Sequence, residues 1–379
     1  MASNVKRTTL LVLFFILFGV ASIVFTSPVY RGMILHGFSD IEDYQIFDVR
    51  TLHASETPFH FAKGPTWKPP DILLNGRESL PLVEFLKRTK SVAFLVIKND
   101  ELMYEHYLDN YRRDSLVTTF SITKAVTSML IGAAIDDGYI RSAQQPVTDF
   151  VPEIKSLGYG RVHLEHLLQM TAGMDYDEYE GNPFSLHSRF YYHPNLESLL
   201  LKIGLKRPPG EQFEYQSSAT QLLGLILKRV LKDESITHYL QRRLWTPLGM
   251  EYGGSWNLDS AAHGLEKVYA GLNSTAIDLA KIGRLYLNKG NWEGTQVLPE
   301  SWIELSTLRD DSNGSVIRYQ YGWWIMSERY GDYRAEGDGG QVLYVNPALQ
   351  VIIVRFGRNR GDLDWSDWKQ VLTQVAEKA

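Results

Sequence analysis

The sequence contains no cysteine in 379 residues. That absence excludes a disulfide framework, a cysteine nucleophile and thiolate metal sites, and it fits both oxidising and reducing compartments. Basic residues do not dominate, because the net charge at neutral pH is −5 and no concentrated basic patch is present. Nucleic acid is therefore not an expected partner. The chain also lacks internal repeats and low-complexity tracts.

The overall composition is that of a folded globular protein. Apolar residues make up 44% and charged residues 22% of the chain, which excludes a disordered polymer. The length accommodates one large or two ordinary domains with ample surface to bury.

Charge is also missing from residues 8–26, directly after Lys6 and Arg7. About 19 residues at ~1.5 Å each match the ~30 Å hydrocarbon core of a bilayer, so the pattern predicts a transmembrane anchor. The positive-inside rule then places the chain from residue 27 onward on the extracytoplasmic side. A cleaved signal peptide is the alternative, with Gly19-Val20-Ala21 as a poor cleavage site.

Three segments follow from this pattern: an anchor or signal at 1–26, a lead-in at 27–79 and a catalytic domain at 80–379. Four prolines, at positions 58, 65, 69 and 70, break any long element in the lead-in, which carries no recognisable chemistry.

Secondary-structure patterns inside 80–379 predict an α+β fold. Two β-rich runs, 91–98 and 101–108, flank Asn99-Asp100 and predict a hairpin. Residues 121 to about 300 are mostly helical and form an insertion, after which strands return. One antiparallel sheet with a helical insertion and two terminal helices on one face satisfies this order. The other expected helices are 80–90, 164–170, 220–232, 236–244, 275–287 and 365–378, and the late strands are 320–326, 333–336, 341–345 and 350–356.

The strongest chemical signal is Ser121-Ile122-Thr123-Lys124 at the start of an apolar helical run. Residues three apart share a helix face, so the Lys124 amine can take the proton of the Ser121 hydroxyl. The same spacing at Ser3–Lys6 and Ser366–Lys369 is not followed by such a helix. The alternative is that Ser121 is a helix N-cap and Lys124 a solvated first-turn residue.

Tyr215 and Ser217 follow a rigid Pro-Pro-Gly loop and precede the 220–232 helix. A phenol beside a lysine ammonium has a lowered pKa and can pass a proton to a leaving group. The alternative is that Tyr215 packs at the helix entry and Ser217 is an N-cap.

A third element is the glycine-rich run from Glu336 to Gln341. Glycines that open a strand let a substrate approach the backbone. The N–H groups of Gln341 and Ser121 could then hold a tetrahedral oxyanion. An ordinary glycine hairpin turn is the alternative.

Together, Ser121–Lys124, Tyr215-Gln216-Ser217 and Asp338-Gly339-Gly340 resemble the three motifs of the serine β-lactamase and penicillin-recognising family, in its class C-like branch. Residues 166–174 and 245–250 also look like that family, and 213–224 looks most like its 6-aminohexanoate-dimer hydrolase and esterase group. The resemblance implies a β-lactamase/transpeptidase-like fold. It also implies catalytic roles for Ser121, Lys124 and Tyr215, and oxyanion or substrate-binding roles for Gln341, Ser217, Asp338, Gly339 and Gly340.

The departures from the family pattern bear on the substrate. Asp338 and Gly339 stand where penicillin-recognising members carry a cation and a hydroxyl, and Ser217 replaces an asparagine. A substrate carboxylate would be repelled, whereas a small neutral ester, or an amide near a positive charge, suits Asp338 and Glu336. The resulting hypothesis is an exported, membrane-anchored serine hydrolase that forms an acyl-enzyme on Ser121 and uses no metal or cofactor.

Other readings stay open at this point. They are an inactive envelope binding protein, a structural envelope protein, and a true β-lactamase or D-alanyl-D-alanine carboxypeptidase. His163 and His166 lack a third metal ligand, and Glu266-Lys267 is interpreted as a solvated or structural pair. Tyr191-Tyr192 is expected to fill the helical block, and Tyr176 to reach the cleft.

Overall fold

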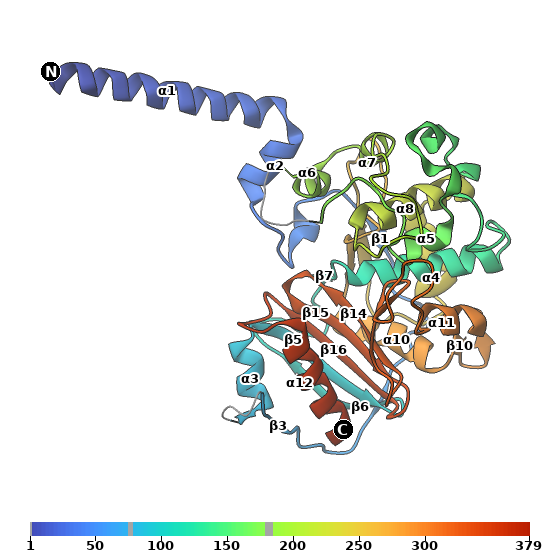
Figure 1. Cartoon of the computed structure of the whole chain (residues 1–379). Helices are drawn as coiled ribbons and strands as arrows, with labels where there is room; N and C mark the ends of the chain where they lie inside the picture. The colour runs from blue at the N-terminus through green and yellow to red at the C-terminus, as the bar shows by residue number, and fades with distance from the viewer. Residues whose placement is uncertain (1, 75–78, 179–184) are drawn as a thin grey trace.

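The computed structural model describes residues 2–74, 79–178 and 185–379. Its main sheet has eight strands in the order β12-β13-β14-β15-β16-β5-β6-β2 and lies in the lower part of the molecule in the view of Figure 1. Its strands pair antiparallel, apart from the parallel edge pair β2 and β6. The α+β prediction is therefore confirmed. The strands are β2 (Ala62–Lys63), β5 (Ser91–Lys98), β6 (Glu101–Tyr107), β12 (Tyr319–Gln320), β13 (Trp323–Ser327), β14 (Asp332–Gly337), β15 (Gln341–Asn346) and β16 (Val351–Gly357).

The predicted hairpin is present as β5 and β6, with Lys98 paired to Glu101 across the turn. Asn99 and Asp100 have φ angles of 50° and 64°. A two-residue turn with both central residues at positive φ matches the right-handed twist of the strands, and Asn and Asp tolerate it. Strand β16 then joins this N-terminal hairpin to the C-terminal strands.

Two helices cover one face of this sheet, as predicted: α3 (Leu82–Arg88) and α12 (Trp365–Lys378) (Figure 1). The rings of Phe85 and Trp368 lie 5.5 Å apart. They pack in one apolar cluster with alternate strand residues such as Phe94 and Val96. Side chains alternate between the two faces of a strand, so the intervening residues pack on the other face of the sheet.

The helical insertion covers that other face. Helix α10 lies close to the strands, because a Cβ at Gly283 would come within 2.8 Å of the Ile352 side chain. Helix α4 is buried from Ile122 to Ala134. The helices are α4 (Ile122–Asp136), α5 (Leu164–Leu168), α6 (Leu186–Tyr192), α7 (Leu196–Leu200), α8 (Ser217–Leu231), α9 (Ile236–Leu240), α10 (Ala276–Leu287) and α11 (Glu300–Ser306), with a π-helix at Gln241–Trp245 and 3₁₀ turns at Asp43–Gln45, Val147–Asp149, Pro152–Leu157, Tyr159–Arg161 and Asp338–Gly340.

A second sheet, β1-β8-β9-β7, joins the lead-in to the insertion. This sheet was not predicted from the sequence, because strands of two to four residues show too little alternation of apolar and polar residues to be recognised. This sheet helps to position the site, because β7 ends two residues before Phe120, which directly precedes Ser121. The strands are β1 (Val49–Leu52), β7 (Val117–Thr118), β8 (Gly254–Asn257) and β9 (Leu272–Ser274), and two further short pairs are β3 (Asp71–Ile72) with β4 (Leu80–Pro81) and β10 (Asn291–Trp292) with β11 (Thr295–Gln296).

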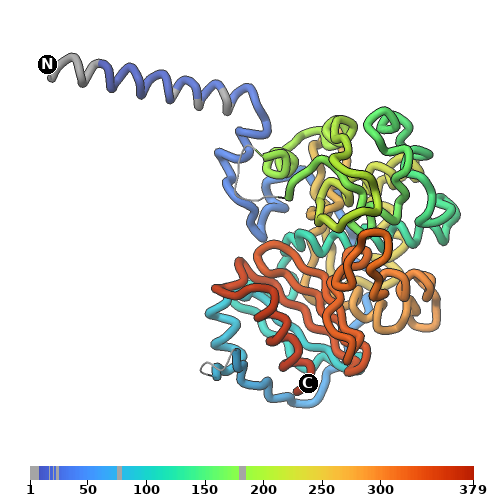
Figure 2. The backbone as a smooth tube through the Cα atoms, in the orientation of Figure 1, coloured from blue at the N-terminus to red at the C-terminus, as the bar shows by residue number. Residues whose placement is uncertain are grey.

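The N-terminal helix α1 (Ala2–Thr26) extends away from the rest of the molecule, and α2 (Pro28–His36) lies beside α6 (Figures 1 and 2). Over the described parts of the chain, no helix is both long and apolar enough to cross a membrane. The transmembrane anchor predicted at 8–26 is thus not supported. The domain boundaries predicted near residues 26 and 79 stay a prediction.

Candidate active site

The turn that carries Ser121 is tightly held. Thr119 binds the Leu272 carbonyl through both its N–H (2.9 Å) and its hydroxyl (2.8 Å). Phe120 follows with a φ of 46°, a left-handed conformation that a bulky residue rarely adopts. Strand β14 approaches closely, because a Cβ on Gly337 would lie 2.3 Å from the Thr119 carbonyl oxygen. The surroundings therefore fix the backbone that presents Ser121.

Ser121 and Lys124 meet as the helical spacing predicts. Lys124 is only 2% exposed, and its Nζ donates to Ser121 Oγ over 2.8 Å and to the Tyr269 carbonyl over 3.1 Å. Ser121 stands at the N-cap position of α4, yet its side chain makes no capping bond. The alternative of a capping serine and a solvated lysine is therefore wrong.

Tyr215 lies over the same pair. Its ring centroid is 4.8 Å from Lys124 Nζ, and its ring stacks on Trp324 at 5.7 Å. Burial raises the pKa of the Tyr215 phenol well above its usual value, helped by Tyr319 and the carboxylate of Glu178, although a hydrogen bond with Ser121 acts the other way. The expected lowering of this pKa is wrong, because burial raises it. Tyr215 is a neutral phenol at neutral pH.

Ser217 contacts Glu178, a site residue that was not predicted from the sequence. Its hydroxyl donates to Glu178, and its N–H donates to the other Glu178 oxygen over 2.8 Å. Burial would raise the pKa of Glu178, but a hydrogen bond to His187 and the charge of Lys124 outweigh burial and lower it. An ionised carboxylate therefore faces the site. Ser217 is not the N-cap of α8, since Gln216 holds that position.

The only sequence signal for Glu178 was the acidic run Asp175-Tyr176-Asp177-Glu178. Tyr176, which was expected to reach the cleft, is 1% exposed and hydrogen-bonds His187 Nδ1 over 2.9 Å. It acts behind the cavity, where it orients the histidine that contacts Glu178.

The glycine-rich turn is placed differently from the prediction. Gln341 is buried, and its side chain amide donates to the Asp338 carbonyl (2.8 Å) and the Gly357 carbonyl (2.7 Å). Gly340 has a φ of 81° and packs on Arg355, so the turn requires a glycine at this position. Gly337 and Asp338 line the cavity instead.

These groups surround a cavity of about 510 Å³. Four of the predicted site residues line the cavity: Ser121, Tyr215, Ser217 and Asp338. The described lining residues do not include Gly339, Gly340 or Gln341. Lys124 is also absent from them and contacts Ser121 through its amine. Tyr191 and Tyr192, expected to fill the helical block, line it as well. The lead-in was expected to carry no chemistry, yet it contributes to the wall. The remaining lining residues are Met33, Gly37, Phe38, Ser39, Phe120, Glu178, His187, Ser188, Tyr269, Ala270, Trp324, Glu336, Gly337, Arg360 and Trp365.

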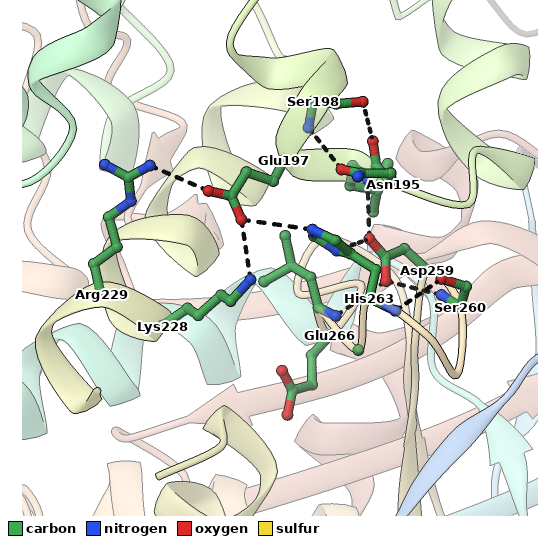
Figure 3. Close-up of polar contacts among 12 residues, drawn as sticks. Asn195, Glu197, Ser198, Lys228, Arg229, Asp259, Ser260, His263 and Glu266 are labelled. Carbon is green, nitrogen blue, oxygen red and sulfur yellow. Dashed lines mark hydrogen bonds and ion pairs between the residues drawn. The ribbon is translucent and has the colours of Figure 1, made fainter. Parts of the chain in front are cut away.

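A polar network connects α7, α8 and the segment 259–265. Asp259 accepts the N–H of Leu196 (2.9 Å) and Nδ1 of His263 (2.8 Å), and Glu197 lies between His263 and the cations of α8 (Figure 3). The network thus attaches the 259–265 segment to α7 and α8.

The predicted Glu266-Lys267 pair is not formed. Glu266 binds Arg50 at 2.7 Å, while Lys267 donates to the Tyr191 carbonyl. Burial lowers the pKa of Lys267 to about 7. Among the side chains that the structure describes, no group of three acidic, histidine or cysteine residues could hold a metal ion.

Comparison with known proteins agrees with this geometry. A family model described as "Beta-lactamase" matches residues 82–369. The 6-aminohexanoate-dimer hydrolase of Paenarthrobacter ureafaciens is 27% identical over 294 residues, which cover 72% of this chain and 74% of that protein.

Solved structures show the same fold. A Bacillus anthracis protein, provisionally described as a 6-aminohexanoate-dimer hydrolase, superposes with a TM-score of 0.77 at 23% identity, covering 90% of this chain and 91% of its own. A penicillin binding protein from Bacillus halodurans gives 0.61 at 18% identity, covering 77% and 98%. The β-lactamase/transpeptidase-like fold is confirmed.

Proposed function

Because the chain belongs to the Beta-lactamase family of serine hydrolases, we propose that it cleaves an ester or amide through an acyl-enzyme on Ser121. The observation that carries this proposal is the 2.8 Å hydrogen bond between Lys124 and Ser121 at the base of the cavity. A buried amine can accept the serine proton when the carbonyl carbon is attacked. An inactive binding protein would not need this arrangement.

The contacts among Ser121, Lys124 and Tyr215 define a route for the proton during the reaction. Ser121 Oγ bonds to the carbonyl carbon as its proton passes to Lys124. When the bond to the leaving oxygen or nitrogen breaks, the proton returns from Lys124 through the Tyr215 hydroxyl to the leaving atom. Tyr215 suits this relay as a neutral phenol, since its raised pKa keeps its own proton at neutral pH. Water, losing a proton by the same route, then releases the acyl group.

For the oxyanion we propose the N–H groups of Ser121 and Asp338 in place of Gln341. Asp338 begins the 3₁₀ turn Asp338–Gly340, where the first N–H has no acceptor within the turn. It also lines the cavity, next to Gly337, which touches the nucleophile turn. Donors fixed in advance stabilise the charge without rearranging.

The charges of the cavity favour an amine-bearing substrate. Glu178 is ionised and Asp338 is exposed at the edge, whereas the charge of Glu336 is neutralised by Arg334. We propose a neutral ester, or an amide that carries a cationic amine, as the substrate class. The name of the Paenarthrobacter relative makes a 6-aminohexanoate dimer a fitting amide to test.

The test compares wild-type protein with Ser121→Ala on a panel of p-nitrophenyl acetate, the 6-aminohexanoate dimer and nitrocefin. We expect turnover of the ester or the dimer that disappears in Ser121→Ala. Efficient nitrocefin turnover with neither of the others would favour a true β-lactamase. No turnover, from a protein that also resists a serine-reactive probe, would favour the inactive binding protein.

We also propose that the catalytic domain is extracytoplasmic and attached to a membrane through the N-terminal segment. Support comes from the uncharged run at 8–26 after two basic residues, and from the exposure of apolar side chains such as Phe15 (67%) and Phe25 (83%). Cell fractionation tests this proposal: the protein should sediment with membranes and resist an alkaline carbonate wash. Recovery in the soluble fraction would contradict it.

A further inference from the structure

The segment from Met33 to Ser39 forms one wall of the catalytic cavity. Met33 belongs to α2, and Gly37, Phe38 and Ser39 follow it, all lining the same cavity as Ser121. The nucleophile lies more than 80 positions later in the sequence. This wall therefore belongs to the substrate site.

The wall is fixed on both sides of Phe38. Helix α2 packs so closely on α6 that a Cβ at Gly32 would lie 2.4 Å from the Tyr192 ring. The Tyr192 hydroxyl donates to the Gly37 carbonyl over 2.9 Å. On the other side, the Ser39 hydroxyl donates to Asp338 Oδ2, also over 2.9 Å. The segment is thus attached to both the helical insertion and the glycine-rich turn.

The Ser39 hydroxyl and the Gly37 carbonyl already have partners in the protein, and this wall also presents apolar side chains to a substrate. Phe38 is 91% exposed, although a phenylalanine gains from leaving water. Met33 lines the same side, and a flexible thioether adapts to varied apolar shapes. Tyr192 adds an aromatic ring beside them.

We propose that Met33 and Phe38 form a subsite for an apolar group of the substrate, an alkyl or aryl chain attached to the scissile ester or amide. This inference rests on the proposed hydrolysis at Ser121. It assigns the lead-in a role in specificity: the apolar chain is bound by Met33 and Phe38, while the carboxylate of Glu178 defines the polar side.

The experiment uses the full chain with p-nitrophenyl acetate and p-nitrophenyl octanoate. Phe38→Ala should lower kcat/KM for octanoate about 10-fold, mainly through KM, and leave acetate within about 2-fold. Phe38→Leu should restore most of the octanoate activity. The matched control is Leu35→Ala, which removes an apolar side chain of α2 that is 64% exposed and does not line the cavity.

Three outcomes would overturn the subsite: an unchanged ratio of octanoate to acetate activity in Phe38→Ala, an equal loss on both esters, or the same loss in Leu35→Ala. Reaction of Phe38→Ala with a fluorophosphonate at the wild-type rate verifies that the nucleophile is intact. If wild-type protein hydrolyses both esters and the variants do not differ, only the subsite fails. If wild-type protein hydrolyses the 6-aminohexanoate dimer but neither ester, the subsite fails alone. If it hydrolyses none of the three substrates, the proposed function fails and the subsite fails with it.

Discussion

Two sides of one cavity differ in how they are encoded. The catalytic side, Ser121 and Lys124, comes from four consecutive residues, and helix geometry alone brings the amine to the hydroxyl. The wall contributed by the lead-in joins Ser39 to Asp338, which are separated by 299 positions. Local spacing thus specifies the chemistry, whereas packing between distant segments shapes the space that the substrate occupies. The two sides should respond differently to substitution.

The largest effect is expected for Lys124→Ala. Without a base beside Ser121, kcat/KM for an ester should fall by about 10²–10⁴-fold, the usual contribution of a general base. The Ser-x-x-Lys at Ser366–Lys369 in α12 offers a control, because Lys369 donates to the Met326 carbonyl away from the cavity. Lys369→Ala should keep wild-type activity. Comparable losses in both variants would mean that the fold, not the base, is being measured.

A smaller loss, about 10²-fold in kcat, is expected for Tyr215→Phe, because the leaving atom loses its proton relay. Burial raises the pKa of Tyr215, so the phenol stays protonated well above neutral pH. Ultraviolet titration between about pH 7 and pH 10 should therefore show equal tyrosinate formation in wild type and Tyr215→Phe. One tyrosinate fewer in the variant over this range would show that Tyr215 ionises and would contradict the neutral relay.

Glu178→Gln examines the polar side of the cavity. The variant should lower kcat/KM for an amine-bearing amide about 10-fold relative to a neutral ester, since one ionic contact with the substrate is lost. The control is Glu153→Gln, which removes a carboxylate paired with Arg229 outside the cavity. If amide and ester decline together, Glu178 supports Ser217 and does not recognise the substrate.

Ser39→Ala should have the smallest effect. It removes the hydrogen bond that attaches the lead-in to Asp338, which is worth about 0.5–1.5 kcal/mol. We expect KM for p-nitrophenyl octanoate to rise about 3-fold while thermal unfolding shifts little. Thr57→Ala, elsewhere in the lead-in, should change neither quantity. A loss confined to kcat would place Ser39 in the chemical step and contradict this assignment.

The sequence could predict what depends on short spacing. The β5–β6 hairpin follows from Asn99-Asp100, and the Ser121–Lys124 contact follows from helix geometry. The pattern also led to the correct sheet and terminal helices. Each of these features depends on residues that are neighbours in the chain or repeat with a fixed period.

The rest depends on distant contacts. Burial of Tyr215 against Tyr319, which reverses the expected pKa shift, could not be foreseen from the residues beside Tyr215. Glu178 reaches Ser217 across 39 positions. The oxyanion role predicted for Gln341 depends on the turn: neighbouring strand positions face opposite ways, so a small offset in the turn decides which N–H faces the cavity.

The central claim is that Ser121, activated by Lys124, is the nucleophile. Intact mass after treatment with a fluorophosphonate, followed by peptide mapping, tests it most directly. We expect one adduct, located on Ser121, that is absent in Ser121→Ala and forms far more slowly in Lys124→Ala. An adduct that persists in Ser121→Ala, or a folded wild-type protein that takes up no adduct, would contradict the account.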